Sequence, residues 1–374
     1  MRRGVTRHQL YEYDTFCEHQ HNFNTDLKIS NMGEVDPSFI QDIEHRPKLV
    51  VTEAQGIPLI DLSIPNTQLV VSQIAEACKN WGFFQVINHG VPLQLQEKVF
   101  LASKSFFSQS KEEKQRVRRD EFNPLGYYDT ELTKNVRDWK EVFDFTVENP
   151  MVMPASADPQ DKDVQKFVNQ WPRNPKYLRE LCEEYAKEVE KLSFKIMGLI
   201  ALSLGLSPNR FDEFFKDSTS FIRLNYFPPC PIPDLALGVG RHKDAGALTV
   251  LYQDDVGGLE VKRKTDGEWI RVKPIPHAYN INVGDVIQAW SNDKYESVEH
   301  RVIVNSERER ISIPFLFHPS HSTMVKPLVE LTNDEIPANY KEYNWGKFFA
   351  ARLLSNFKKL AVENIQINHY KVSA

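Results

Sequence analysis

The 374-residue sequence predicts an α+β protein whose core is a double-stranded β-helix, or jelly roll, with flanking helices. Two observations predict this fold. From about residue 220 to about 319, short strands alternate with turn residues, and no helical period is visible. Before them, residues 178–204 place apolar side chains along one side of a long helix that has no interior proline.

The first half of the chain mixes strands with helices. Residues 57–62 and 81–88 are apolar runs bounded by turn residues, which predicts a strand in each. The apolar spacing over 68–80 and 93–108 predicts two helices. Residues 123–173 hold many prolines and few periodic runs, so we expect long connecting loops there.

Both ends of the chain extend beyond this core. The polar N-terminal stretch shows no sustained apolar period, so we expect an extension that wraps the body or is partly disordered. The tail is helical over 343–360, and packing of its apolar face against the barrel is favoured over a membrane or partner contact. The expected regions are the extension (1–48), a mixed helix and strand region (49–165), a long supporting helix (166–218), the jelly-roll core (219–320) and a helical tail (321–374).

Composition excludes several classes of protein. The formal net charge is −5 with both signs interspersed, and no basic block suggests nucleic acid. No apolar run is long enough to span a membrane, and no signal or transit peptide is recognised. The four cysteines (Cys17, Cys78, Cys182 and Cys230) form no CxxC pair, which suits a reducing compartment. We therefore expect a cytoplasmic monomer without nucleic-acid or membrane partners.

A histidine and an aspartate two residues apart begin the strongest functional pattern. On a strand, His242 and Asp244 would point to the same side. The pair alone is weak evidence, because one His-x-Asp is expected by chance in roughly every second chain of this length. His300, on a later strand, completes a two-histidine, one-carboxylate set, although a lone strand histidine is more often structural. Such a set binds non-haem Fe(II) and leaves positions open for substrate and O₂, and zinc accepts the same ligands.

An arginine and a serine after His300 favour iron with a carboxylated cosubstrate. Arg310 and Ser312 would point to one side of the next strand. A buried arginine is costly unless it pairs with an anion, and its planar fork suits a carboxylate. The alternative is an ion pair with Glu307 or Glu309 in the preceding turn. A 2-oxo acid would fit both ends of the site, since one end chelates iron and the other reaches the arginine.

Longer motifs carry a resemblance that runs from about residue 57 to about residue 360, most of the chain. They are IPLIDLS (57–63), WGFFQVINHGVP (81–92), NYFPPCP (225–231), ALGVGRHKDAGALTVL (236–251), GGLEVK (257–262), NVGDVIQAWSND (282–293), SVEHRV (297–302) and RISIPFLFHP (310–319). With these motifs the chain resembles the plant-type Fe(II)/2-oxoglutarate-dependent dioxygenases of the isopenicillin N synthase-like superfamily. The resemblance implies a jelly-roll core with the metal at its mouth, helices bracing one side and no second catalytic domain.

The resemblance also implies roles for individual residues. The positions that match the family's iron ligands are His242, Asp244 and His300, and those that match its anchors for the far carboxylate of 2-oxoglutarate are Arg310 and Ser312. Ascorbate is expected to support the iron.

The strand that begins this cosubstrate pocket departs from the family pattern. Asn225 falls beside the cosubstrate, but the usual tyrosine before the PPCP-like turn is Phe227. Tyr226 is the remaining candidate for a phenol contact, although adjacent strand residues face opposite ways. One lost hydrogen bond to a charged group costs about 1.5–3 kcal/mol, so we expect weaker cosubstrate binding but an active enzyme.

Five residues are candidates for substrate contact. Arg223 would meet a substrate anion or, equally well, form an interstrand ion pair. Phe143 and Phe145 fall where family members line the pocket, although an aromatic pair on a strand is more often core. Leu316 stands where flavonoid-oxidising members usually carry phenylalanine, which disfavours a flavonoid substrate. His318 lies at the pocket-side end of its strand.

The resemblance implies an oxygenase that couples decarboxylation of 2-oxoglutarate to oxidation of a small molecule, either a specialised metabolite or a hormone. Hydroxylation is the expected outcome, with desaturation or demethylation as alternatives. Two other classes stay open: a non-haem iron oxidase that uses O₂ without 2-oxoglutarate, and a non-catalytic metabolite-binding protein on the same fold. The sequence does not identify the substrate.

Overall fold

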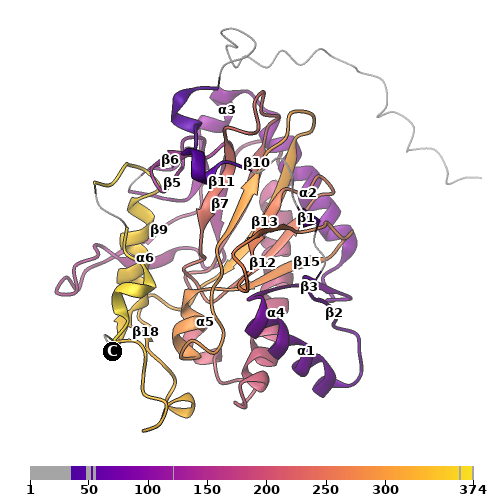
Figure 1. Ribbon diagram of the computed structural model, residues 1–374. Helices are drawn as coiled ribbons and strands as arrows, with labels where there is room; N and C mark the ends of the chain where they lie inside the picture. The colour runs from indigo at the N-terminus through magenta and orange to yellow at the C-terminus, as the bar shows by residue number, and fades with distance from the viewer. Residues whose placement is uncertain (1–34, 48–51, 54–55, 121, 362–363, 373–374) are drawn as a thin grey trace, which may run out of the picture. The chain divides into compact units, whose positions relative to one another are not determined.

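Two β-sheets build the barrel at the centre of the molecule (Figure 1). The computed structural model describes residues 35–47, 52–53, 56–120, 122–361 and 364–372. Within these residues, the larger sheet has the strand order β2 (Leu59–Asp61), β3 (Phe83–Ile87), β15 (Tyr279–Val283), β12 (Leu248–Gln253), β17 (Arg310–Phe317), β10 (Phe221–Phe227), β7 (Glu141–Thr146) and β4 (Gly126–Tyr128). The smaller sheet has the order β1 (Thr52–Glu53), β14 (Trp269–Arg271), β13 (Leu259–Lys262), β16 (His300–Ile303) and β11 (Leu237–His242). The barrel strands pair antiparallel, which confirms the predicted jelly roll.

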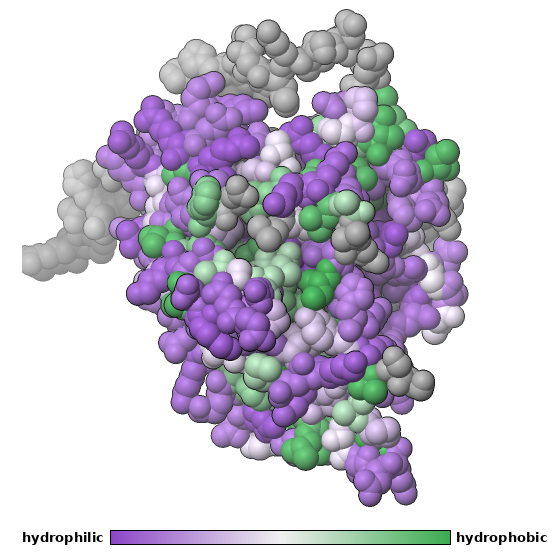
Figure 2. Space-filling view, turned by 90° about the vertical axis from the view of Figure 1, so that its left-hand side faces the viewer, coloured by the Kyte–Doolittle hydropathy of each residue, from purple (hydrophilic) through white to green (hydrophobic). Residues whose placement is uncertain are grey.

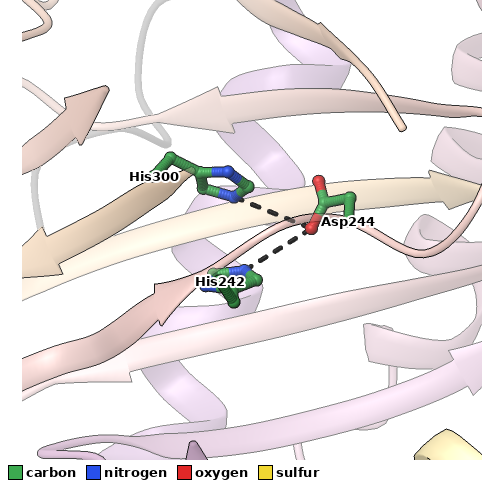
Figure 3. Close-up of side chains that lie close together, drawn as sticks. All are labelled: His242, Asp244 and His300. Atoms are coloured by element: carbon green, nitrogen blue, oxygen red, sulfur yellow. Dashed lines mark ion pairs between the residues drawn. The ribbon is translucent and has the colours of Figure 1, made fainter. Parts of the chain in front are cut away.

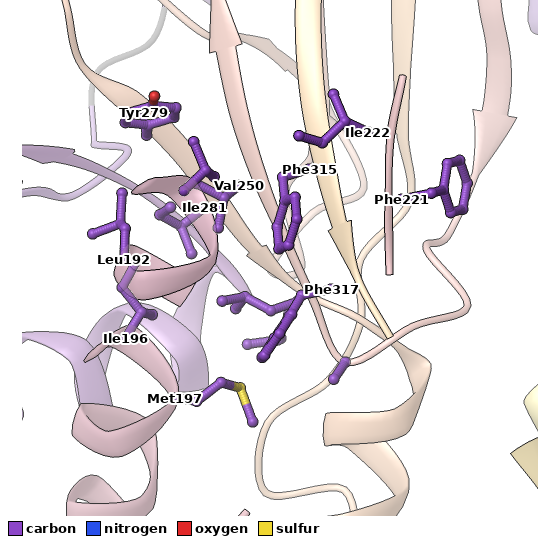
Figure 4. Packing of buried hydrophobic residues seen from close by; sticks show 14 of the residues in the cluster. Leu192, Ile196, Met197, Phe221, Ile222, Val250, Tyr279, Ile281, Phe315 and Phe317 are labelled. Carbon is purple, nitrogen blue, oxygen red and sulfur yellow. The ribbon is translucent and has the colours of Figure 1, made fainter. Parts of the chain in front are cut away.

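The helices that brace one face of the larger sheet are α1 (Thr67–Asn80), α2 (Leu93–Phe107) and α4 (Leu178–Ser203). Each lies within one residue of its predicted bounds. α4 contacts β12 and β17, with α1 and α2 packed beside it. In Figure 4, Leu192 and Ile196 of α4 lie across from the buried side chains of the sheet, which include Phe315 and Phe317. Removing such apolar surface from water stabilises the fold by roughly 25 cal/mol per Å².

The region 123–173 differs from the prediction. The expectation of long loops is wrong, because β7 lies inside the larger sheet between β10 and β4. The strand is only six residues long and lies among prolines and charged residues, so its alternation is hard to read. The same region holds two hairpins, formed by β5 (Leu132–Thr133) with β6 (Val136–Arg137) and by β8 (Met151–Pro154) with β9 (Val164–Phe167).

A short helix, α5 (Asp285–Trp290), also interrupts the strand-rich region. The sequence pattern shows no helical period there, because six residues complete fewer than two turns. The C-terminal helix α6 (Trp345–Leu354) ends before residue 360, earlier than predicted. Its Trp345, Phe348 and Phe349 are buried, so the prediction that this face packs on the body is confirmed.

Residues 35–47 of the predicted extension pack on the body, and the remainder of residues 1–48 lies outside the described residues. Two hydrogen bonds attach this segment to the body. The N–H of Gln41 donates to the Leu235 carbonyl at 2.9 Å, and Arg301 donates to the His45 carbonyl at 3.1 Å. The remaining short elements are η1 (Pro37–Phe39), η2 (Ile43–His45), α3 (Lys111–Gln115), η3 (Asp212–Phe215), β18 (Met324–Val325), η4 (Val329–Leu331), β19 (Tyr343–Asn344) and η5 (Ile367–Tyr370).

One face of the molecule is mostly polar (Figure 2). Figure 2 shows a largely hydrophilic face on which apolar side chains form small, separate groups. None of the described helices combines the length and apolar content needed to cross a bilayer.

Candidate active site

Two histidines and an aspartate converge, with one ligand atom of each within 4.8 Å of the others (Figure 3). His242 ends β11 and His300 begins β16, and the two residues are opposite each other in the register of these strands. Oδ1 of Asp244 lies 3.5 Å from Nε2 of His242 and 3.6 Å from Nε2 of His300. Bonds of about 2.1 Å to one octahedral ion separate neighbouring ligand atoms by about 3 Å, so small side-chain shifts would accommodate a metal.

Backbone contacts orient both imidazoles. Nδ1 of His242 donates to the Gly240 carbonyl at 2.8 Å, and Nδ1 of His300 lies 3.4 Å from the Val298 carbonyl. Both Nε2 atoms are therefore directed at the shared centre, as in metal sites where the second nitrogen is held by a carbonyl. Burial, with the neighbouring His242, lowers the pKa of His300 to about 4, so this imidazole is neutral at physiological pH and able to bind a metal.

The aspartate is held by its other oxygen. Oδ2 of Asp244 accepts hydrogen bonds from Thr249 Oγ1 at 2.5 Å and from Asn282 Nδ2 at 2.8 Å, which leaves Oδ1 for a metal. Burial by itself would raise the pKa of Asp244. The nearby His300 and His242 and the hydrogen bond from Asn282 outweigh burial and hold this pKa well below its usual range. The carboxylate is thus ionised, as a metal ligand must be.

A buried arginine lies in the same cavity without a carboxylate partner. Arg310 is 2% exposed, and it donates to Gln253 Oε1 at 2.8 Å and to Ser312 Oγ at 3.2 Å, while its Nε has no partner. Among the residues that the structure describes, no carboxylate lies within ion-pair distance of it. Burial lowers the pKa of Arg310 to about 10, against the opposing effect of Asp254, so the side chain remains a cation at neutral pH.

The two glutamates that might have paired with Arg310 do not. Glu309 binds Lys104 Nζ at 2.6 Å and accepts from the Tyr226 hydroxyl at 3.1 Å, while Glu307 is exposed. The Tyr226 ring stacks on Phe107 at 5.4 Å and does not line the cavity. The prediction that Tyr226 contacts the cosubstrate is therefore wrong, because adjacent residues of a strand face opposite sides of the sheet.

Asn225 and Phe227 lie on the cavity side of the same strand. Asn225 pairs with Ser312 in register, and its Nδ2 lies 3.4 Å from Ser312 Oγ, while its Oδ1 is buried without a partner. Phe227 pairs with Arg310 in register, and its ring centre is 4.9 Å from the guanidinium carbon. Phe227 therefore covers the arginine with an aromatic face and offers no hydroxyl.

A cavity of about 700 Å³ joins the metal residues to this arginine. Its lining includes the apolar side chains of Phe221, Leu316 and Phe349 together with polar ones such as Arg352 and Gln366. His318 also lines it, is 3% exposed, and meets the rings of Phe221 and Phe349 edge to face. Burial lowers the pKa of His318 to about 3, so it presents a neutral imidazole to the cavity.

Two predicted pocket residues belong to the core. Phe143 packs on Phe106 at 4.9 Å and Phe145 on Trp171 at 5.0 Å, and neither lines the cavity. The prediction that at least one of them contacts substrate is therefore wrong. Asp144, between them, points the other way, because strand residues alternate in direction.

Arg223 lines the cavity, but its charge is already paired. Nε and Nη2 donate to the two carboxylate oxygens of Asp144 at 2.8 Å each, and Nη1 donates to Glu131 Oε2 at 2.8 Å. This is the interstrand ion pair that was the alternative to binding a substrate anion.

The sequence reasoning missed Thr249, Gln253 and Asn282, which hold Asp244 and Arg310 in place. A signal for two of them exists: Thr249 and Gln253 are polar residues at alternating positions of the apolar strand LTVLYQ. Polar residues on the inner face of such a strand indicate a site.

Known proteins share this architecture. The family model of the 2OG-Fe(II) oxygenase superfamily matches residues 218–319, and the model of the non-haem dioxygenase in morphine synthesis N-terminal matches residues 57–174. Protein DMR6-LIKE OXYGENASE 2 of Arabidopsis thaliana is 36% identical over 86% of this chain and 90% of its own length. Flavanone 3-dioxygenase 2 of Oryza sativa subsp. japonica is 38% identical over 89% and 93%.

A solved structure agrees with these relatives. The crystal structure of JOX2 in complex with 2OG, Fe and JA superposes with a TM-score of 0.74, at 35% identity, over 88% of this chain and 93% of that one. The chain belongs to the 2OG-Fe(II) oxygenase superfamily, as the sequence motifs predicted. It is an Fe(II)- and 2-oxoglutarate-dependent oxygenase that acts on small molecules.

Proposed function

We propose that His242, Asp244 and His300 bind the Fe(II), and that Arg310 and Ser312 bind the far carboxylate of 2-oxoglutarate. The observation that carries this assignment is the buried Arg310, a cation without a carboxylate partner among the described residues, in the same cavity as the three ligand atoms. A dianionic cosubstrate offers the missing anion at one end and a chelating 2-oxo acid at the other.

The side chains supply geometry, and the bound iron and cosubstrate supply the capacity to activate O₂. The fork of Arg310 donates to the carboxylate, and Ser312, which accepts from Arg310 and Asn225, keeps its own hydroxyl hydrogen to donate. Phe227 shields the guanidinium from water but adds no hydrogen bond. The protein should therefore bind 2-oxoglutarate more weakly than it would with a tyrosine at position 227.

The substrate is proposed to be a small specialised metabolite or hormone, with hydroxylation as the reaction. Phe221, Leu316 and Phe349 offer apolar contacts, and His318 offers one neutral polar group. The relatives include a flavanone dioxygenase and a JA complex. Leu316 in place of the phenylalanine usual in flavonoid-oxidising members favours a substrate other than a flavonoid.

We further propose a monomer in the cytoplasm, with ascorbate maintaining the iron. Cys78, Cys182 and Cys230 are free and buried, which suits a reducing compartment.

Anaerobic titration of the Fe(II)-loaded protein with 2-oxoglutarate tests these assignments. The wild type should develop a visible metal-to-ligand charge-transfer band, and His300→Ala should abolish it while the protein stays folded. Absence of the band in folded wild-type protein would overturn the proposed roles. Substrate oxidation that proceeds without 2-oxoglutarate would instead indicate an oxidase.

A further inference from the structure

A network of largely buried charges, three of which line the cavity, lies apart from the metal residues. Three cations and three anions alternate in it, so its formal charges balance. The contacts are Arg119 with Asp144 (2.5 Å) and Glu131 (2.6 Å), Lys140 with Glu131 (2.7 Å) and Asp138 (3.0 Å), and Arg223 with Glu131 and Asp144 (2.8 Å each). Taking charged groups out of water costs free energy, so a buried network of six charges suggests a function beyond stability.

Asp138 is the member at which this network meets the metal-bearing strand. Its Oδ1 accepts from the N–H of Gly240 at 2.9 Å, and its Oδ2 accepts from Thr133 Oγ1 at 2.8 Å. The carbonyl of Gly240 in turn accepts from Nδ1 of His242 at 2.8 Å. A chain of two hydrogen bonds therefore runs from the Asp138 carboxylate through one glycine to the imidazole.

The strand needs this support at Gly240. The pairing of β11 with β16 shifts register between Val239 and His242, and Gly240 has no partner in that register. The Asp138 carboxylate accepts the N–H that the ladder leaves free. The contact is close, since a Cβ on Gly240 would lie only 2.8 Å from a methyl carbon of Thr133.

We propose that Asp138 is a positioning residue for the metal ligand His242. It holds the N–H of Gly240, and the carbonyl of the same residue then fixes the direction in which Nε2 of His242 faces the metal. Asp138 is itself held by Thr133, whose Oγ1 donates to its Oδ2, and this hydrogen bond does not involve Lys140. This inference rests on the proposed iron site. It implies that the segment around Asp138 supports the metal ligands.

Metal affinity of the whole chain tests this role, measured anaerobically with Co(II) as the probe through its visible absorption. The double variant D138A/K140M removes one anion and one cation, so the network stays balanced. Loss of an outer partner of a ligating histidine typically weakens metal binding about 10–100-fold. Asp138 lies one hydrogen bond beyond that partner, the Gly240 carbonyl, so we expect a loss at the lower end, about tenfold. D138N keeps an oxygen that accepts from Gly240, so its metal affinity should lie closer to that of the wild type than to that of D138A/K140M.

The matched control is K140M, which removes two ion pairs from the same network but leaves the contact of Asp138 with Gly240. We expect it to lower the thermal midpoint while metal affinity stays near that of the wild type. Equal affinities of K140M and D138A/K140M would overturn the inference, and so would an equal weakening in all three variants. Failure of the wild type to bind Co(II) or Fe(II) would contradict the proposed iron site itself.

Discussion

Two arginines, the partly buried Arg223 and the buried Arg310, line one cavity from adjacent strands, and their surroundings differ. The guanidinium of Arg223 donates three hydrogen bonds to the carboxylates of Asp144 and Glu131. Among the described residues, the hydrogen bonds of Arg310 go to the neutral oxygens of Gln253 and Ser312, and its Nε has no partner. The protein therefore satisfies the first cation by itself, and the second remains to be satisfied by a ligand. Loss of Arg223 should affect stability, and loss of Arg310 should affect binding.

Arg223→Met should give the largest effect. It leaves two buried carboxylates short of a cation, and removal of one partner from a buried ion pair costs about 3–5 kcal/mol. The free energy of unfolding in urea measures the loss. The control is Arg210→Met, which breaks the more exposed pair with Glu330 (2.6 Å) and should cost no more than about 1 kcal/mol. Equal losses in the two variants would contradict the contrast between the arginines.

Arg310→Met should do the opposite. Stability should hold or rise, because a buried cation without a carboxylate partner is removed. Affinity for 2-oxoglutarate should fall by about 3 kcal/mol, roughly 100-fold, for two lost charge-assisted hydrogen bonds. Titration of the charge-transfer band measures this affinity, with Arg308→Met, an exposed arginine paired to Asp255, as the control. Cosubstrate affinity within a few-fold of the wild type would mean that Arg310 does not bind 2-oxoglutarate.

Phe227→Tyr should sharpen the binding side of the comparison. A phenol placed opposite Arg310 adds one hydrogen bond to the cosubstrate carboxylate, worth about 1.5–3 kcal/mol, so binding should tighten by about tenfold or more. Tyr226→Phe is the matched control, because its hydroxyl bonds Glu309 away from the cavity. It should leave cosubstrate affinity unchanged, and a larger effect from it than from Phe227→Tyr would reverse the assignment of the two positions.

The sequence predicted one arginine better than the other, and the reason is physical. His242 and Arg310 lie on predicted strands, so the directions of their side chains could be inferred before the structure was known. Asp244 lies two residues beyond the end of β11, so the expectation that it shares a strand with His242 is wrong, although the two side chains do meet. The partners of Arg223 come from β7 and the segment that precedes it, where prolines and charges suggested loops. Whether a buried cation is paired depends on tertiary contacts, which no local pattern records.

The short strands and helices limited the prediction for the same reason. β7 and α5 hold six residues each, too few to show a period, while the 26-residue α4 was predicted within one residue of its bounds. Phe143 was placed in the pocket by resemblance, although the direction of β7 was unknown. Its true direction follows from the pairing with Leu224 of β10, which is a core residue.

His318 extends the comparison to a buried group that stays neutral. Burial lowers its folded-state pKa to about 3, below the value of about 6.5 for an exposed histidine, so as pH falls through 6.5 the unfolded chain takes up a proton that the folded chain does not. The contribution of the neutral His318 to stability is therefore fully present above pH 6.5. It declines toward lower pH, by on the order of 1–2 kcal/mol at pH 5. Urea unfolding of wild type and His318→Phe at pH 7 and pH 5 measures this contribution. The variant should lose less stability between the two values, and an identical loss would show that His318 does not enter the folded state as a neutral, buried group.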